Sequence, residues 1–182
     1  WNDLALLKDT VKKHHHELAA IITEPVMCNS GCILPDEGFL SGMRALCDEF
    51  GMALIFDEVI TGFRLSLGGA QQYFNIKPDI SVFAKAIASG YPLSVISGKS
   101  EWMELIEKSR VIHAGTMNSS NATVAAALAT IEILELENPY KRIFQLGRQL
   151  MDGLRAAALE TNQFLLVQGP GPMFNIAFTQ LE

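Results

Sequence analysis

Two ionisable residues, Asp57 and Lys85, stand directly after short apolar segments of the sequence. Asp57 follows the run Ala53 to Phe56, and Lys85 follows the segment Ile80 to Ala84. A carboxylate at the end of a buried strand needs a partner, because burial of an unpaired charge is costly. A partly desolvated lysine amine is a nucleophile that forms Schiff bases with carbonyl compounds. Together the two groups could hold a cationic heterocycle that carries an aldehyde.

Each residue alone also has a simpler interpretation. Asp57 could accept hydrogen bonds from the backbone of the next turn, or bind a metal ion or an arginine. Lys85 could be a surface lysine on a loop. The pair favours pyridoxal phosphate, whose ring nitrogen needs a carboxylate and whose aldehyde needs a lysine.

The elements that would position this pair alternate between helices and short apolar strands. Residues 3–16, 36–50, 101–108 and 121–136 are predicted helices, and residues 18–23, 53–56, 80–84 and 93–97 are predicted strands. In the second helix, Asp36 is the expected N-cap and Gly51 the expected C-cap glycine. Continuous apolar strands are typical of a parallel sheet covered on both faces. Ligands bind such sheets at the carboxyl ends of the strands, where we expect Glu24, Asp57 and Lys85 to converge.

The last quarter of the chain has a different pattern. A long helix is predicted from Pro139 to about Glu160, and two apolar segments, 164–167 and 173–178, flank a Gly-Pro turn at residues 169–172. We therefore predict that residues 1–137 are part of a large cofactor-binding domain and that residues 138–182 begin a small, incomplete α+β C-terminal domain. Because the chain starts at Trp1 and ends after an apolar segment, we interpret it as an internal part of a longer protein.

Composition narrows the class of protein. The 182 residues are 49% hydrophobic and carry a net charge of −6 without a basic patch, which argues against a nucleic-acid partner. The apolar runs are too short to span a bilayer, so no membrane association is predicted. Three cysteines, a low and odd number, argue against a disulfide framework. This fits a reducing compartment and favours a cytoplasmic location.

Three other motifs carry weaker signals. Gly98-Lys99-Ser100 resembles the end of a phosphate-binding loop, but Leu93 stands where that loop needs its first glycine. The histidines at 14–16 point about 100° apart on a helix and do not converge on a metal. Cys28 and Cys32 have no second pair to complete a zinc site, so no metal is predicted.

Larger blocks of the sequence carry a family resemblance. The blocks contain the motifs EPVMCNSG, FDEVITGFR, FAKAI and HAGTMN, in that order. They resemble class III pyridoxal-phosphate aminotransferases, and within them the glutamate-1-semialdehyde aminomutase branch. The similarity runs from Leu18 to Leu136 and more faintly to the end. Gaps of 28 positions from Asn29 to Asp57 and from Asp57 to Lys85 suit that branch.

The resemblance implies a type I fold, an α/β/α sandwich with a mainly parallel sheet, and a role for each of five residues. Asp57 would pair with the pyridine nitrogen, Val59 would pack against the ring, and Lys85 would form the Schiff base and transfer protons. Asn29 would reach the cofactor's 3-hydroxyl. Thr116 would bind the cofactor phosphate across the interface of a homodimer.

Some of these residues have simpler interpretations. Val59 could be ordinary core packing, and both Asn29 and Thr116 could be turn residues. Glu24 is expected to accept hydrogen bonds from the backbone. Many ω-aminotransferases have Glu where Asn29 stands and Gln where Ile60 stands, so these two positions favour the aminomutase branch. The sequence 88–91 lacks the Gly-rich run that this branch usually has after the lysine. The family's phosphate loop and substrate-carboxylate contacts lie outside the chain.

The predicted function is amino-group transfer between an amino acid or amine and a keto or aldehyde acceptor, both small molecules. Intramolecular transfer of the glutamate-1-semialdehyde aminomutase type is the first alternative. An inactive structural or interaction subunit of the same fold is the second. A racemase or decarboxylase would use the same Asp57 and Lys85 and differ in the bond that breaks.

Overall fold

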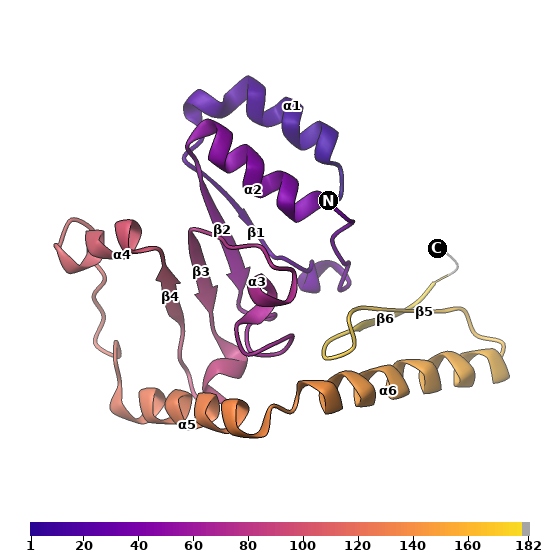
Figure 1. The fold of residues 1–182 in the computed structure, drawn as a ribbon. Helices are drawn as coiled ribbons and strands as arrows, with labels where there is room; N and C mark the ends of the chain where they lie inside the picture. Colours follow the sequence, from indigo (N-terminus) through magenta and orange to yellow (C-terminus); the bar gives the residue numbers. More distant parts are fainter. Residues whose placement is uncertain (180–182) are drawn as a thin grey trace.

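The computed structural model describes residues 1–179. The first part of the chain forms a four-stranded sheet (Figure 1). The strands lie in chain order: β1 (Ala20–Thr23), β2 (Ala53–Glu58), β3 (Ile80–Phe83) and β4 (Val95–Gly98). The first three are parallel, and β4 runs antiparallel to β3. The predicted α/β fold with a mainly parallel sheet is therefore confirmed. Of the described residues, none forms a helix that is both long and apolar enough to cross a membrane.

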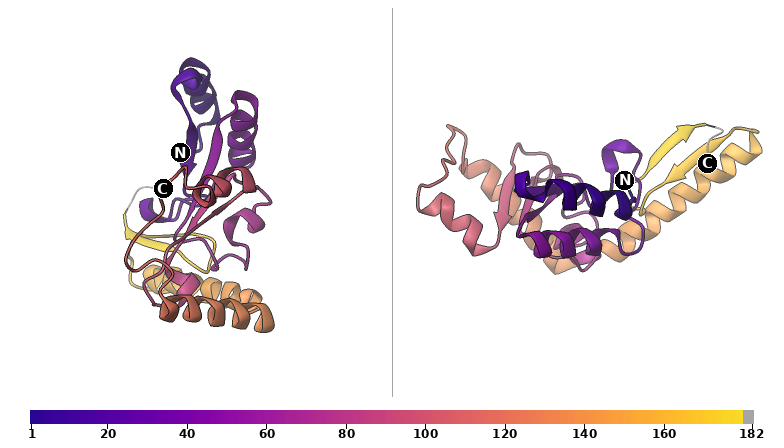
Figure 2. Two further views of the ribbon diagram at one scale, coloured as in Figure 1. Left: turned by 90° about the vertical axis from the view of Figure 1, so that its left-hand side faces the viewer. Right: turned by 90° about the horizontal axis from the view of Figure 1, so that it is seen from above.

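Two helices cover one face of the sheet. α1 (Leu4–His14) and α2 (Phe39–Phe50) lie side by side in both figures and contact each other (Figures 1 and 2). Leu54 and Phe56 of β2 are fully buried in the core that these helices form. The opposite face leaves Ile22 65% exposed and Ile96 45% exposed. The expected cover on both faces is thus present on one face only within the described chain.

The start of α2 differs from the prediction. The helix begins at Phe39, and its N-cap position is taken by Gly38, not by Asp36. Gly38 has φ 82°, a left-handed conformation that a helix cannot continue, so the chain enters the helix only after this residue. The predicted C-cap glycine of this helix is confirmed, because Gly51 ends the helix with φ 66°.

The connection from β3 to β4 explains why β4 is antiparallel. Eleven residues separate the two strands, and they include the short 3₁₀ helix η3 (Lys85–Ala88). A parallel crossover needs a dozen or more residues and usually an α-helix, so this connection returns the chain in the opposite direction. A short helix, α4 (Ser100–Glu107), follows β4.

The C-terminal part extends away from the sheet (Figures 1 and 2). It contains α6 (Tyr140–Glu160) and the antiparallel hairpin of β5 (Leu165–Gln168) and β6 (Asn175–Phe178). The preceding helix, α5 (Asn121–Glu137), packs against η3, where Ala127 is buried with Phe83 and Ile87. Arg155 of α6 donates to the Val167 carbonyl at 2.7 Å, which attaches the hairpin to α6. At the tip of this unit, Gln168 Nε2 donates to the Gly31 carbonyl at 2.8 Å. The division at Asn138, which joins α5 to α6 with φ 42°, stays a prediction.

A buried carboxylate holds the amino ends of β2 and β3 together. Asp79 is 4% exposed and accepts from the Leu54 N–H at 2.7 Å, while Arg44 and Lys99 pair with its two oxygens. Burial raises the pKa of the Asp79 carboxyl, but the bonds from Lys99, Leu54 and Arg44 outweigh burial and lower it. Because the folded-state pKa is lowered, the stabilisation is complete above the ordinary carboxyl pKa of about 3.9 and is lost at lower pH.

We expect Asp79→Asn to lower the free energy of unfolding by about 2 kcal/mol at pH 7, because it weakens the buried hydrogen bonds to the partly buried Arg44 and to the Leu54 N–H. The pair with Lys99 adds little, because the Lys99 side chain is exposed. Denaturant unfolding of the variant and the wild type measures this difference. The difference should narrow as the pH falls below the ordinary carboxyl pKa of about 3.9, and it should vanish only below the lowered folded-state pKa of Asp79. A difference that does not change with pH would contradict the assigned role of the charge.

Candidate cofactor site

Asp57 lies in β2, on the face of the sheet that α1 and α2 leave uncovered. Side chains alternate along a strand, and Leu54 and Phe56 point into the core beneath α2, so Asp57 points the other way. Its Oδ1 accepts a hydrogen bond from the Val59 N–H at 3.0 Å. Within the part of the chain that the structure describes, no hydrogen bond or ion pair involves Asp57 Oδ2. The carboxylate is thus held by one oxygen and can offer the other to a ligand.

Lys85 follows β3 and begins η3, so it stands just past the strand end. Its side chain is exposed, and its backbone has φ 51°, a left-handed conformation that is uncommon for lysine. Such conformations occur preferentially at functional sites, where the surrounding structure holds them. Lys85 lies in an open groove that is lined by Arg64, Lys85, Ala86, Ser89, Gly90, Tyr91, Pro92 and Leu93.

The strand register brings Asp57 and Lys85 to the same edge of the sheet. Asp57 pairs with Val82 and Glu58 pairs with Phe83, the last residue of β3. Lys85 comes two positions after Phe83. Both groups therefore emerge at the carboxyl ends of adjacent parallel strands, as the sequence predicted. The groove beside Lys85 does not include Asp57 among its described lining residues, so the two are neighbours at one edge and do not share one pocket here.

Glu24 and Asn29 form a local unit after β1. The Glu24 carboxylate accepts from the backbone N–H groups of Cys28 at 3.1 Å and Asn29 at 3.4 Å, which confirms the backbone role expected for Glu24. It also accepts from the Asn29 side-chain amide at 3.1 Å. The exposed Asn29 side chain is thereby oriented by Glu24, with its Oδ1 and second N–H left over for a ligand.

Thr116 and Val59 take different places. Thr116 lies in an exposed turn before α5, where the Asn118 N–H donates to the Gly115 carbonyl at 3.0 Å. The structure does not bring Thr116 into the groove of Lys85. Val59 is half-buried and follows the strand that carries Asp57. Its backbone N–H, rather than its side chain, is the group that the structure shows in contact with Asp57.

Glu58 was not singled out from the sequence. It is fully buried and accepts hydrogen bonds from Thr61, Ala70 and Gln71. Burial raises the pKa of the Glu58 carboxyl, and these bonds only partly oppose burial. Its one sequence signal is the position directly after Asp57, in a strand whose other buried residues are apolar.

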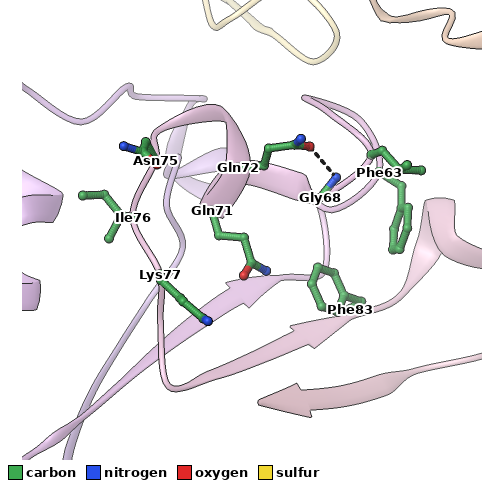
Figure 3. Close-up of a pocket in the computed structure, with 9 residues that line it drawn as sticks. Phe63, Gly68, Gln71, Gln72, Asn75, Ile76, Lys77 and Phe83 are labelled. Carbon is green, nitrogen blue, oxygen red and sulfur yellow. Dashed lines mark hydrogen bonds between the residues drawn. The ribbon is translucent and has the colours of Figure 1, made fainter. Parts of the chain in front are cut away.

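A second hollow lies on the other side of the sheet. It is lined by apolar and amide side chains and by Lys77, from α3 (Gly69–Tyr73) and its flanking loops, together with Phe63 and Phe83 (Figure 3). Its wall includes the Gly68 N–H, which donates to Gln72 Oε1 at 2.8 Å. Phe83 pairs with Glu58 and shares its face, opposite that of Asp57. This hollow is therefore separate from the candidate cofactor site.

The thiols near Asn29 are poorly suited to bind metal. Burial, then contact with Cys32, raises the pKa of the Cys28 thiol to about 12, and burial also raises the pKa of Cys32. Thiolates, not thiols, bind zinc. No group of three His, Cys, Asp or Glu side chains is arranged to hold a metal ion within residues 1–179.

A mainly parallel sheet with a carboxylate and a lysine at the ends of adjacent strands is consistent with the type I fold of pyridoxal-phosphate enzymes. The model of the aminotransferase class III family matches residues 3–182 of this chain, which therefore belongs to that family.

Individual proteins agree with this assignment. A glutamate-1-semialdehyde 2,1-aminomutase of Clostridium botulinum (strain Alaska E43 / Type E3) is 42% identical over 184 residues, covering 100% of this chain and 43% of that protein. An ω-transaminase from Sphaerobacter thermophilus superposes with a TM-score of 0.92 at 30% identity, covering 100% of this chain and 42% of that chain. A transaminase with PLP bound superposes with a TM-score of 0.88 at 28% identity, covering 94% of this chain and 41% of that chain. The chain thus spans less than half the length of these relatives.

We expect Cys28 to react with iodoacetamide at least ~100-fold more slowly than free cysteine at pH 8, because its raised pKa leaves little thiolate. The rate can be followed by mass spectrometry of the peptide that contains Cys28. Free cysteine under the same conditions is the reference. Alkylation at a comparable rate would show that the loop does not bury this thiol.

Proposed function

We propose that the protein containing this chain is a pyridoxal-phosphate-dependent aminotransferase that moves an amino group between an amino acid or amine and a keto or aldehyde acceptor. The observation that carries the proposal is the pairing of β2 with β3, which brings Asp57 and Lys85 to one sheet edge. Membership of the class III family and the likeness to a transaminase with PLP bound support it.

The residues present fit this cofactor. The open oxygen of Asp57 is an anionic acceptor for a protonated ring nitrogen, and the exposed Lys85 amine, at the same edge of the sheet, is available for covalent attachment. Asn29, oriented by Glu24, supplies a polar contact, and no metal-ligand cluster competes within the described residues. When bound, the cofactor supplies an electron sink for the charge that develops at the substrate Cα.

The chain's own residues would then divide the work. Asp57 holds the proton on the ring nitrogen through a charge-assisted hydrogen bond, which the Val59 N–H supports from the other oxygen. Lys85 Nζ would hold the cofactor covalently and, when freed by the amine substrate, would act as the general base that takes the proton from the substrate Cα. The Val59 side chain packs against the ring, and Asn29 binds the ring hydroxyl.

We also propose a homodimer in which Thr116 binds the cofactor phosphate of the partner subunit. Two observations support it: Thr116 lies outside the groove of Lys85, and the exposed segment around it includes large apolar side chains. Ile112 is 88% exposed and Met117 is 73% exposed, and Leu128 of α5 is also exposed. Exposed apolar side chains of this extent are typical of surfaces that a partner covers.

Intramolecular amino transfer of the aminomutase type is the second candidate. The 42% identity to a glutamate-1-semialdehyde 2,1-aminomutase favours it, as does Asn29 in the place where many ω-aminotransferases have Glu. The free thiols of Cys28, Cys32 and Cys47 support a reducing, cytoplasmic location for either enzyme.

Incubation of the complete protein with pyridoxal phosphate should give an absorbance band near ~420 nm, typical of lysine Schiff bases of this cofactor, that borohydride fixes covalently. Mass spectrometry should place the adduct on Lys85. Lys85→Ala should lose both band and adduct and reduce the rate of amino transfer by at least ~1000-fold, since one group serves as anchor and as base. Lys108→Ala, which changes a surface lysine of the α4 end, should behave as the wild type. An adduct elsewhere, or none, would overturn the proposal.

The dimer is tested by mixing two inactive variants, Lys85→Ala and Thr116→Asp, after dissociating and reassociating the subunits. If Thr116 acts across the interface, a hybrid dimer contains one site with both wild-type residues. Half of the dimers are then hybrids with one good site, so activity should recover to about a quarter of wild type. If Thr116 acts within its own subunit, every site has one defect and the mixture stays inactive.

A further inference from the structure

Glu58, the residue after Asp57, is a buried acid that the proposed function leaves without a role. It is 0% exposed and points to the face of the sheet opposite Asp57, toward α3. None of the ion pairs among the described residues involves it. A buried carboxylate without a cation is costly unless hydrogen bonds satisfy it, so its contacts indicate what it does.

Four donors surround the Glu58 carboxylate. Oε2 accepts from the Ala70 N–H at 2.5 Å and from Thr61 Oγ1 at 2.9 Å. Oε1 accepts from the Gln71 N–H at 3.0 Å and from Gln71 Nε2 at 3.4 Å. Gln71 Nε2 also donates to Ser81 Oγ at 3.1 Å. All donors belong to the segment 61–71, so this one carboxylate ties that segment to the end of β2 and, through Gln71, to β3.

Val59 directly follows Glu58, between that residue and the segment that Glu58 holds. Val59 is the second residue of a turn in which the Gly62 N–H donates to the Glu58 carbonyl at 2.9 Å. The Thr61 hydroxyl of the same turn donates to the Glu58 side chain. The Val59 N–H is the described group that holds Asp57 Oδ1, at 3.0 Å. Arg64, in the groove of Lys85, lies on the same tied segment.

We propose that Glu58 is a positioning residue: its buried carboxylate fixes segment 59–71 so that the Val59 N–H orients Asp57 toward the cofactor ring nitrogen. The last step rests on the proposed function of Asp57, whereas the hold on Val59 does not. Glu58 touches neither cofactor nor substrate, and acts on the opposite side of the strand that presents Asp57.

A substitution at Gly69 can disturb the hydrogen bonds of the Glu58 carboxylate while Glu58 itself stays unchanged. Gly69 has φ 73°, and a Cβ atom there would overlap the carboxylate of Glu58. Gly51 has a similar φ of 66°, with nothing within 4 Å of the corresponding Cβ position. Gly69→Ala and Gly51→Ala therefore share the same backbone strain, and only Gly69→Ala also displaces the Glu58 carboxylate.

The first test compares Glu58→Gln with Asp79→Asn in the complete protein. Both variants neutralise a buried carboxylate, but Asp79 lies at the amino end of β3, away from Asp57. Amide hydrogen exchange without cofactor should be at least ~10-fold faster in segment 59–71 for Glu58→Gln than for Asp79→Asn, compared at equal distance below the unfolding midpoint. With pyridoxal phosphate, Glu58→Gln should lose visible circular dichroism and bind the cofactor about 10-fold more weakly, whereas Asp79→Asn should match the wild type.

The second test repeats both measurements on the glycine pair. Gly69→Ala should reproduce the effects of Glu58→Gln, although Glu58 is intact, and Gly51→Ala should not. Equal exchange in segment 59–71 for both members of each pair would overturn the role of Glu58. A wild-type protein that binds no pyridoxal phosphate would overturn the proposed function instead; the exchange measurement, made without cofactor, still decides whether Glu58 holds Val59.

Discussion

The parallel pairing of β2 with β3 is the constraint on which the candidate site depends. In this register Phe56 lies beside Ser81 and Asp57 beside Val82. A shift of one residue would turn Asp57 into the core beneath α2 and bring Phe56 to the open face. Two buried carboxylates bracket the pair: Asp79 binds β2 at the amino end, and Glu58 reaches β3 through Gln71 at the carboxyl end. The buried side chains of Leu54 and Phe56 supply the apolar burial between them.

This arrangement separates chemistry from support on the two sides of one strand. The face of Asp57 remains open to a ligand, and the face of Glu58 is occupied by core and by the backbone of α3. Alternation along a strand therefore lets adjacent acids serve different purposes. Lys85 shows a related division along the chain, since its amine is exposed while Ile87 and Ala88 of the same short helix are buried.

The parts that sequence could predict are those with local signals. The apolar runs before Asp57 and Lys85 predict strands, and parallel strands bring their ends together, which the structure confirms. The short helix α3 was missed, because five residues that begin with glycine have little helical propensity or periodicity. Glu58 was missed because two of its four donors are backbone N–H groups, which any sequence supplies. The N-cap assigned to Asp36 was wrong for a similar reason: the left-handed Gly38 decides where α2 starts, and a side-chain preference does not override it.

The bond from Gln168 to the Gly31 carbonyl joins segments that are 137 positions apart. Gly31 closes the short turn that contains Asn29, and Gln168 stands at the end of β5 in the outlying hairpin. The hairpin is attached to α6 by Arg155, so α6, the hairpin and the Asn29 turn form a mechanical linkage. A rotation of α6 relative to the sheet would either break the hydrogen bond from Gln168 to Gly31 or move the Asn29 turn as well. The orientation of the C-terminal unit is thus coupled to the turn that carries Asn29.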